Sequence, residues 1–138
     1  MNALLSIKPE FAERIMDGTK RYEYRRRVFG KPVERIFVYA SSPHQHIVGE
    51  IEVAGIHSAA PSEIWRRTRA SSGISYGYFK EYFFQRREAH AIEVAAVIVY
   101  NHPVNPYVLI NGFVPPQSYM YLHDRVAEII RGAVLEHS

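Results

Sequence analysis

Cysteine is absent from the 138 residues of this chain, and long apolar runs are absent with it. Without cysteine the protein has no disulfide, no thiolate zinc site and no cysteine nucleophile, a usage that fits an intracellular compartment. No window approaches the roughly 18 apolar residues of a membrane span, and the run at 3–7 is too short for a signal peptide. We therefore expect a cytoplasmic protein that does not associate with membranes.

Motifs for cofactors and metals are scarce as well. The chain has neither a glycine-rich phosphate loop nor a Gly-x-Ser-x-Gly elbow. His44 and His46 lie two residues apart, but no third ligand stands beside them in the sequence. Other histidines are scattered and do not indicate a general base: His57, His90, His102 and His123. We expect neither a metal nor a cofactor.

What the chain does contain is typical of a globular protein, with 47% hydrophobic and 22% charged residues. Its length predicts one domain, 1–138. The formal net charge of +3 is unevenly spread. Residues 1–35 hold nine basic and five acidic side chains, and 64–87 hold six basic and one acidic, so the remainder is acidic. Two basic regions of this kind favour an anionic partner.

Hydrophobic periodicity and turn residues predict one order of helices and strands. Strands are expected at 3–7, 20–29, 33–41, 46–56 and 89–100, with a further short one at 107–110. Helices are expected at 9–18, 61–70, 76–87 and 117–138, the last capped near Ser118. Because strands and helices do not alternate as in a Rossmann sheet, this order predicts an α+β fold, a small mixed or antiparallel β-barrel with helices packed around it.

The stretch from Gly18 to Arg27 joins one lysine and four arginines to Glu23 and two tyrosines. Gly18, Lys20, Glu23 and Arg25 follow the pattern Gly, any, Lys, two of any, Glu, any, Arg. This pattern resembles that of the ASCH domain (activating signal cointegrator homology), whose fold is a PUA-like β-barrel. Further segments look like the same family: 4–18, 38–43, 47–53 and 78–94.

The resemblance implies a cleft between the barrel and the helix before the motif, which takes RNA or a nucleotide-like ligand. Such proteins are described as RNA-binding factors or transcription coregulators. Some relatives resemble small amidohydrolases acting on N4-acetylcytidine, with a catalytic lysine and threonine on this strand. Lys20 matches the lysine, but Glu23 stands in place of the threonine, and a carboxylate does not replace a hydroxyl nucleophile.

We expect Lys20 and Arg25 to meet a phosphate or a base edge, with Glu23 orienting them. On a regular strand Glu23 and Arg25 share one face, and Tyr24 and Arg26 point to the other. The alternative is a structural salt bridge between Glu23 and Arg25 within a solvated basic edge. The other predicted ligand contacts are Lys8 and the hydroxyls of Ser41 and Ser42.

A wider nucleic-acid surface is predicted from arginines in the two basic regions. These are Arg21, Arg27, Arg66, Arg67, Arg69, Arg86 and Arg87. A merely solvated face is the competing interpretation. The aromatic residues of 76–87 favour an amphipathic helix that buries most of them, with one exposed tyrosine for base stacking as the alternative.

The leading hypothesis is a non-catalytic RNA- or nucleotide-binding module associated with transcription or translation. The runner-up is an enzyme, either a hydrolase of a modified nucleoside or a weak ribonuclease, in which Lys20 and Glu23 form an acid/base pair. A third hypothesis is a protein-interaction adaptor that uses Tyr82 and Phe83. The choice among RNA, DNA and a free nucleoside stays open at this point, as does the oligomeric state.

Overall fold

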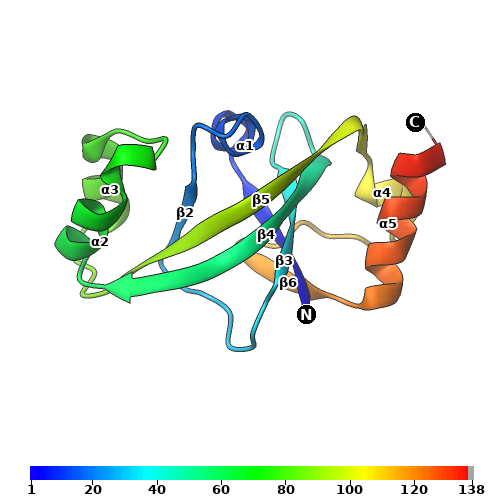
Figure 1. Ribbon diagram of the computed structural model, residues 1–138. Helices are drawn as coiled ribbons and strands as arrows, with labels where there is room; N and C mark the ends of the chain where they lie inside the picture. Colours follow the sequence, from blue (N-terminus) through cyan, green and yellow to red (C-terminus); the bar gives the residue numbers. More distant parts are fainter. Residues whose placement is uncertain (137–138) are drawn as a thin grey trace.

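The computed structural model describes residues 1–136 (Figure 1). Its strands are β1 (Asn2–Ile7), β2 (Tyr22–Arg25), β3 (Arg35–Ala40), β4 (His46–Ala59), β5 (Ala89–Val104) and β6 (Tyr119–Leu122). Its helices are α1 (Pro9–Met16), α2 (Pro61–Thr68), α3 (Tyr76–Tyr82), α4 (Pro106–Leu109) and α5 (Asp124–Glu136), with a short 3-10 turn, η1 (Arg69–Ser71). Within residues 1–136 no helix is long and apolar enough to cross a bilayer.

The six strands form one mixed sheet in the order β2-β5-β4-β3-β1-β6. Among residues 1–136 only β1 and β3 pair in parallel, and every other neighbouring pair is antiparallel. The long strands β4 and β5 cross the molecule side by side, and register shifts along them bend the sheet into a curled half-barrel (Figure 1). The strands β2 and β6 are its two edges.

Three apolar clusters hold the helices on this sheet. The first packs Phe11, Ala12 and Ile15 of α1 against β1, β3, β4 and β5. The second lies under α4 and α5, and the third packs α2 and α3 against the end of the sheet formed by β2 and β5 (Figure 1). Full burial of an aliphatic side chain such as Ile15 is worth about 1.5–3 kcal/mol. The position of α1, and of the chain that follows it, is thereby set by the core.

The predicted order is correct from the first strand to β5, with shorter elements at several places. The strand expected at 20–29 is reduced to β2, and the helix expected at 76–87 ends at Tyr82. The strand expected at 107–110 is wrong, because Pro106 begins α4 and the Asn105 side chain accepts a hydrogen bond from the Tyr107 amide. Proline at the first helical position and asparagine at the cap are start signals of a helix.

The helix expected at 117–138 is also partly wrong. Its first part is the strand β6, which pairs antiparallel with β1, and only Asp124–Glu136 is helical. The four residues Tyr119–Leu122 have high β-propensity, and pairing with β1 overrides the helical spacing of Leu122 with the residues after it. Residues 137 and 138 of the predicted helix lie outside the described residues.

Candidate functional site

A cleft of about 540 Å³ opens where the end of β1, the start of α1, β2, the β3–β4 turn and α3 meet. The loop at 115–117 closes one side of it. All six residues that the sequence analysis names as ligand contacts line this cleft: Lys8, Lys20, Glu23, Arg25, Ser41 and Ser42. They come from three separate segments of the chain, which the curled sheet brings together.

Lys20 lies at the floor of the cleft, with 1% of its surface exposed. Its Nζ donates a hydrogen bond to the Ser72 carbonyl at 2.8 Å and lies over the rings of Tyr24, 4.6 Å from the centroid, and Phe11, at 5.5 Å. Burial lowers the pKa of Lys20 to about 8, an effect that the Glu23 carboxylate opposes and the nearby Arg14 reinforces. A lysine with this pKa changes charge near neutral pH, as proton-transfer groups of enzymes do.

The segment 72–74 holds Lys20 in place. The Arg14 Nη1 donates to the Gly73 carbonyl at 2.7 Å, and the Ser72 hydroxyl donates to the Ile74 carbonyl at 2.9 Å. Gly73 has φ +67°, and a Cβ there would lie 2.4 Å from the Lys20 Cβ. Only glycine fits so close an approach. The presence of a glycine at position 73 does not by itself reveal this contact in the sequence.

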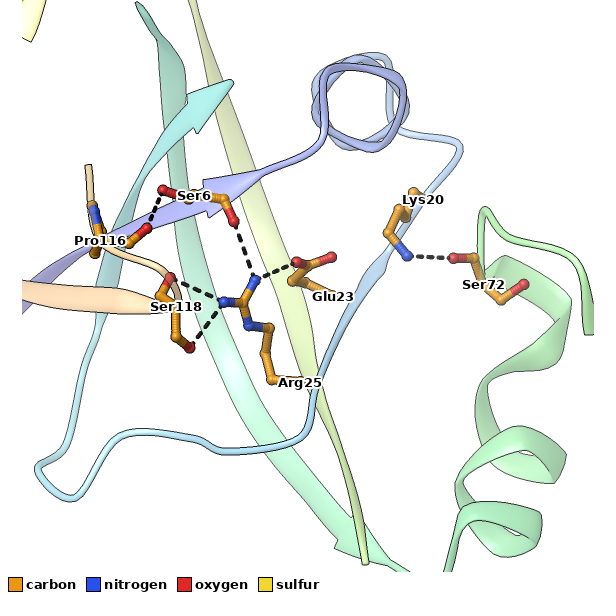
Figure 2. Close-up of polar contacts among 7 residues, drawn as sticks. All are labelled: Ser6, Lys20, Glu23, Arg25, Ser72, Pro116 and Ser118. Atoms are coloured by element: carbon orange, nitrogen blue, oxygen red, sulfur yellow. Dashed lines mark hydrogen bonds and ion pairs between the residues drawn. The ribbon is translucent and has the colours of Figure 1, made fainter. Parts of the chain in front are cut away.

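Glu23 and Arg25 form a second, largely buried unit of the cleft, and Figure 2 shows its contacts. The Arg25 Nη1 donates to Glu23 Oε2 at 3.1 Å and to the Ser6 carbonyl at 3.3 Å. Its Nη2 donates to the Ser118 carbonyl and hydroxyl, both at 3.0 Å. Ser118 directly precedes β6, so Arg25 ties the edge strand β2 to the opposite edge of the sheet.

These four hydrogen bonds bear on the role expected for Arg25. The guanidinium uses its donors on protein acceptors, and its side chain is 11% exposed. In this structure Arg25 holds Glu23 and joins the two sheet edges, and its contact with a phosphate or a base edge stays a prediction. The salt bridge between Glu23 and Arg25, which was the alternative interpretation, is present.

Lys20 and Glu23 both line the cleft, and Figure 2 shows the Lys20 ammonium directed to the Ser72 carbonyl and the Glu23 carboxylate bonded to Arg25. The charged atoms of Lys20 and Glu23 lie more than 4.0 Å apart, so they form no direct ion pair, although each influences the other electrostatically. A group bound in the cleft would therefore have a proton donor and a proton acceptor in the lining around it.

An aromatic wall borders the same cleft on the side of α3. Tyr78 and Tyr82 are half-buried and line the cleft, whereas Phe79 and Phe83 are buried, as an amphipathic helix predicts. Arg26 also lines the cleft, although strand alternation places it on the face opposite Glu23. Arg26 follows β2 in a bend, so the alternation of the strand no longer sets the direction of its side chain.

The seven arginines predicted to extend a nucleic-acid surface all lie outside the cleft. Arg66 and Arg67 donate to Glu63, each with a bond at 3.0 Å, and these bonds lower the pKa of Glu63 to about 2. Arg21 donates to the Val94 carbonyl at 3.3 Å. The remaining four are exposed: Arg27, Arg69, Arg86 and Arg87. The first three contacts fit a solvated face stabilised by local partners.

The histidine pair considered as metal ligands consists of His44 and His46, whose ring centroids are 5.5 Å apart. Burial lowers the pKa of His46, and the neighbouring His44 adds to this effect. In the part of the chain that the structure describes, no group of three or more histidine, aspartate or glutamate side chains gathers to hold a metal.

Residues 5–103 match the ASCH domain family, and they include the motif, the sheet as far as β5 and most of the cleft. The chain belongs to the ASCH domain family. A crystal structure of ASCH from Zymomonas mobilis superposes with a TM-score of 0.89 at 26% identity, covering 95% of this chain and 94% of that one. The expected α+β, PUA-like fold is thereby confirmed.

Two curated relatives of this ASCH domain differ in how much of their length it covers. An ASCH domain-containing ribonuclease of Zymomonas mobilis is 29% identical over 128 residues, which are 87% of this chain and 83% of that protein. The ATP synthase subunit alpha of Ureaplasma parvum is 34% identical over 101 residues, which are 72% of this chain but 13% of that protein.

The ASCH motif acquires a structural meaning from this geometry. Gly18, at φ +86°, ends α1 in a left-handed conformation that favours glycine. Lys20, which follows α1, stays close to the helix because its backbone N–H donates a hydrogen bond to the Arg14 carbonyl at 2.9 Å. Glu23 and Arg25 follow on β2, one bonded to the other. The motif thus builds the floor of the cleft.

Proposed function

We propose that this ASCH domain binds RNA in its cleft and cleaves it, with Lys20 and Glu23 as the proton-transfer pair. The observation that carries the proposal is the buried Lys20 at the cleft floor, whose pKa is lowered to about 8 beside a carboxylate held by Arg25. The name of the Zymomonas mobilis relative, an ASCH domain-containing ribonuclease, supports it.

The charge of the cleft favours a phosphodiester. Its lining holds four cationic side chains, Lys8, Lys20, Arg25 and Arg26, and one carboxylate, Glu23. Because Arg25 is bonded to Glu23 and to protein carbonyls, the cations available to a bound anion are the other three. Ammonium and guanidinium groups are the usual partners of RNA phosphates.

The chemistry assigned to the pair is cleavage by the neighbouring 2′-hydroxyl. The Glu23 carboxylate takes the proton of the 2′-hydroxyl, and the 2′-oxygen attacks the phosphorus. The bond from phosphorus to the 5′-oxygen breaks, and the Lys20 ammonium gives a proton to that oxygen. The products are a 2′,3′-cyclic phosphate and a 5′-hydroxyl. The phosphate would lie in the cleft that both side chains line.

The first experiment compares cleavage and binding of labelled single-stranded RNA by the wild type and by Lys20→Met and Glu23→Gln. Loss of one general acid or base lowers a rate by about 10²–10⁴-fold, so both variants should lose cleavage by that factor. Glu23→Gln should keep most of its RNA affinity, whereas Lys20→Met also removes one of the cations that the cleft offers to a phosphate and should bind more weakly. Lys80→Met serves as the matched control, because Lys80 is exposed on α3 outside the cleft. If the wild type binds RNA but never cleaves it, the domain is a binding module and the catalytic part is refuted.

The pH dependence of the rate tests the two assigned roles. If the Lys20 ammonium is the acid, the rate should fall as the pH rises through about 8, where Lys20 loses its proton. If neutral Lys20 were the base, the rate would rise through the same pH. That second profile would reverse the roles of Lys20 and Glu23.

The modified-nucleoside hypothesis is tested in the same assay. At the position of the expected threonine hydroxyl stands Glu23, and Arg25 donates to its carboxylate, so the residue offers no nucleophilic hydroxyl. N4-acetylcytidine should therefore not be hydrolysed. Turnover of N4-acetylcytidine that disappears in Lys20→Met would favour the amidohydrolase in place of the ribonuclease.

A further inference from the structure

Two tyrosines one helical turn apart form a wall of the cleft. The rings of Tyr78 and Tyr82 are nearly parallel, at 14°, with centroids 6.3 Å apart. Residues at i and i+4 share a helix face, and this face of α3 lines the cleft while Phe79 and Phe83 enter the core. The two tyrosines therefore lie at the cleft, and the two phenylalanines are buried.

A cation lies against each of these rings. The Lys8 Nζ is 5.2 Å from the Tyr78 centroid, and the guanidinium carbon of Arg26 is 4.3 Å from the Tyr82 centroid. The Arg26 Nε also donates to the Tyr82 carbonyl at 2.9 Å, which fixes it at that end of the wall. The wall thus consists of two rings, each with a cation of its own. Single-stranded nucleic acids present the complement, aromatic bases between phosphates.

The wall is adjacent to the proposed reaction site. Phe11 contacts the Tyr78 ring edge-on, with centroids 5.0 Å apart, and the Lys20 Nζ lies 5.5 Å from the Phe11 centroid. A single side chain therefore separates the wall from the lysine. A base stacked on the wall would belong to a nucleotide next to the phosphate at Lys20.

We propose that the Tyr78–Tyr82 wall is a stacking subsite for an unpaired RNA base, and that Lys8 and Arg26 bind the phosphates on either side of that base. This inference rests on the proposed function and deepens it, because it names the form of RNA that the cleft accepts. In a duplex the bases stack on each other and do not present their faces to tyrosine rings. The substrate is therefore single-stranded RNA or an unpaired loop.

The test uses a 2′-O-methyl oligonucleotide of about ten residues, which falls within the usual size of a single-strand site and lacks the 2′-hydroxyl needed for cleavage. One of its bases is 2-aminopurine, whose fluorescence is quenched when it stacks on an aromatic ring. Tyr78→Leu and Tyr82→Leu should each weaken binding by about tenfold or more and reduce the quenching. The phenylalanine variants Tyr78→Phe and Tyr82→Phe should retain both.

Tyr76→Leu is the matched control. Tyr76 lies on the same helix, is 54% exposed and is outside the cleft, so its loss should leave affinity and quenching unchanged. A fully paired duplex of the same sequence should compete poorly with the single strand. With cleavable RNA of the same sequence, the leucine variants should have a higher KM than the wild type and a nearly unchanged kcat.

The outcomes separate this inference from the function beneath it. If the wild type cleaves RNA but the leucine variants bind and quench as the wild type does, the stacking subsite is refuted and the ribonuclease assignment stands. If the wild type accepts duplex as readily as single strands, the inference is again wrong. If the wild type neither binds nor cleaves any RNA, the proposed function itself fails.

Discussion

Burial of the Lys20 ammonium costs free energy of folding, and this cost should appear as a pH dependence of stability. The pKa of Lys20 falls from its ordinary 10.5 to about 8 in the folded protein, chiefly because of burial. At about 1.4 kcal/mol for each pH unit, the difference corresponds to about 3 kcal/mol. That amount is a large part of the free energy of unfolding of a typical small domain.

The sign of the effect follows from proton binding. Between pH 8 and 10.5 the unfolded chain keeps its proton on Lys20 while the folded protein has lost it. The unfolded state thus binds more protons, and the free energy of unfolding rises with pH across this window. Below about pH 8 both states carry the charge, and the folded protein bears the full cost of burying it.

The assay is urea unfolding of the wild type and Lys20→Met at several pH values from about 7 to about 10. The free energy of unfolding of the wild type should gain most of 3 kcal/mol relative to the variant over this range. Lys20→Met also loses the hydrogen bond to the Ser72 carbonyl. This loss lowers its free energy of unfolding by a similar amount at every pH, because neutral Lys20 still donates the bond in the wild type. Other titrating groups cancel in the comparison.

Lys80→Met provides the reference, because Lys80 is exposed. Its free energy of unfolding should run parallel to that of the wild type at all pH values. Parallel curves for Lys20→Met as well would refute the argument, since they would mean that Lys20 carries its charge in the fold as readily as in the unfolded chain. The lowered pKa of Lys20 would then no longer support its role as a proton-transfer group.

Two further predictions concern contacts away from the chemistry. Gly73→Ala should lower the free energy of unfolding, measured in urea, by at least about 1 kcal/mol more than Gly112→Ala does. Both glycines have φ near +70°, but only a Cβ at position 73 would meet Lys20. Equal losses of free energy in the two variants would contradict this clash. Glu50 is buried, which raises its pKa, but hydrogen bonds from Arg131 and other neighbours outweigh burial and hold the pKa below 4.5. Its contribution to stability is therefore complete above pH 4.5 and is lost as the pH falls below that value. In Glu50→Gln the urea concentration at the midpoint of unfolding should consequently fall less steeply with acidification than in the wild type. An equally steep fall in both proteins would count against the pairing of Glu50 with Arg131.

Local patterns in the sequence determined the family and much of the fold. The motif from Gly18 to Arg25 lies within eight consecutive residues, so its spacing is visible without any structure. The strands β1, β3 and β4 and the helices α1 and α2 follow from hydrophobic periodicity and from proline at helix starts. Lys8, Ser41 and Ser42 were predicted as ligand contacts from their places beside a helix start and at a strand end, and all three line the cleft.

The roles of the motif residues were decided by tertiary structure alone. Arg25 reaches Ser118, 93 residues away in the chain, and Lys20 reaches Ser72, 52 residues away. In both cases the main acceptor is a backbone carbonyl, which every residue possesses and which therefore leaves no signature in the sequence. Likewise β6 exists because β1 offers it a partner, and Arg26 lines the cleft because β2 ends one residue before it. Local spacing records which way a side chain faces on its own element, but what it meets there depends on contacts between distant segments.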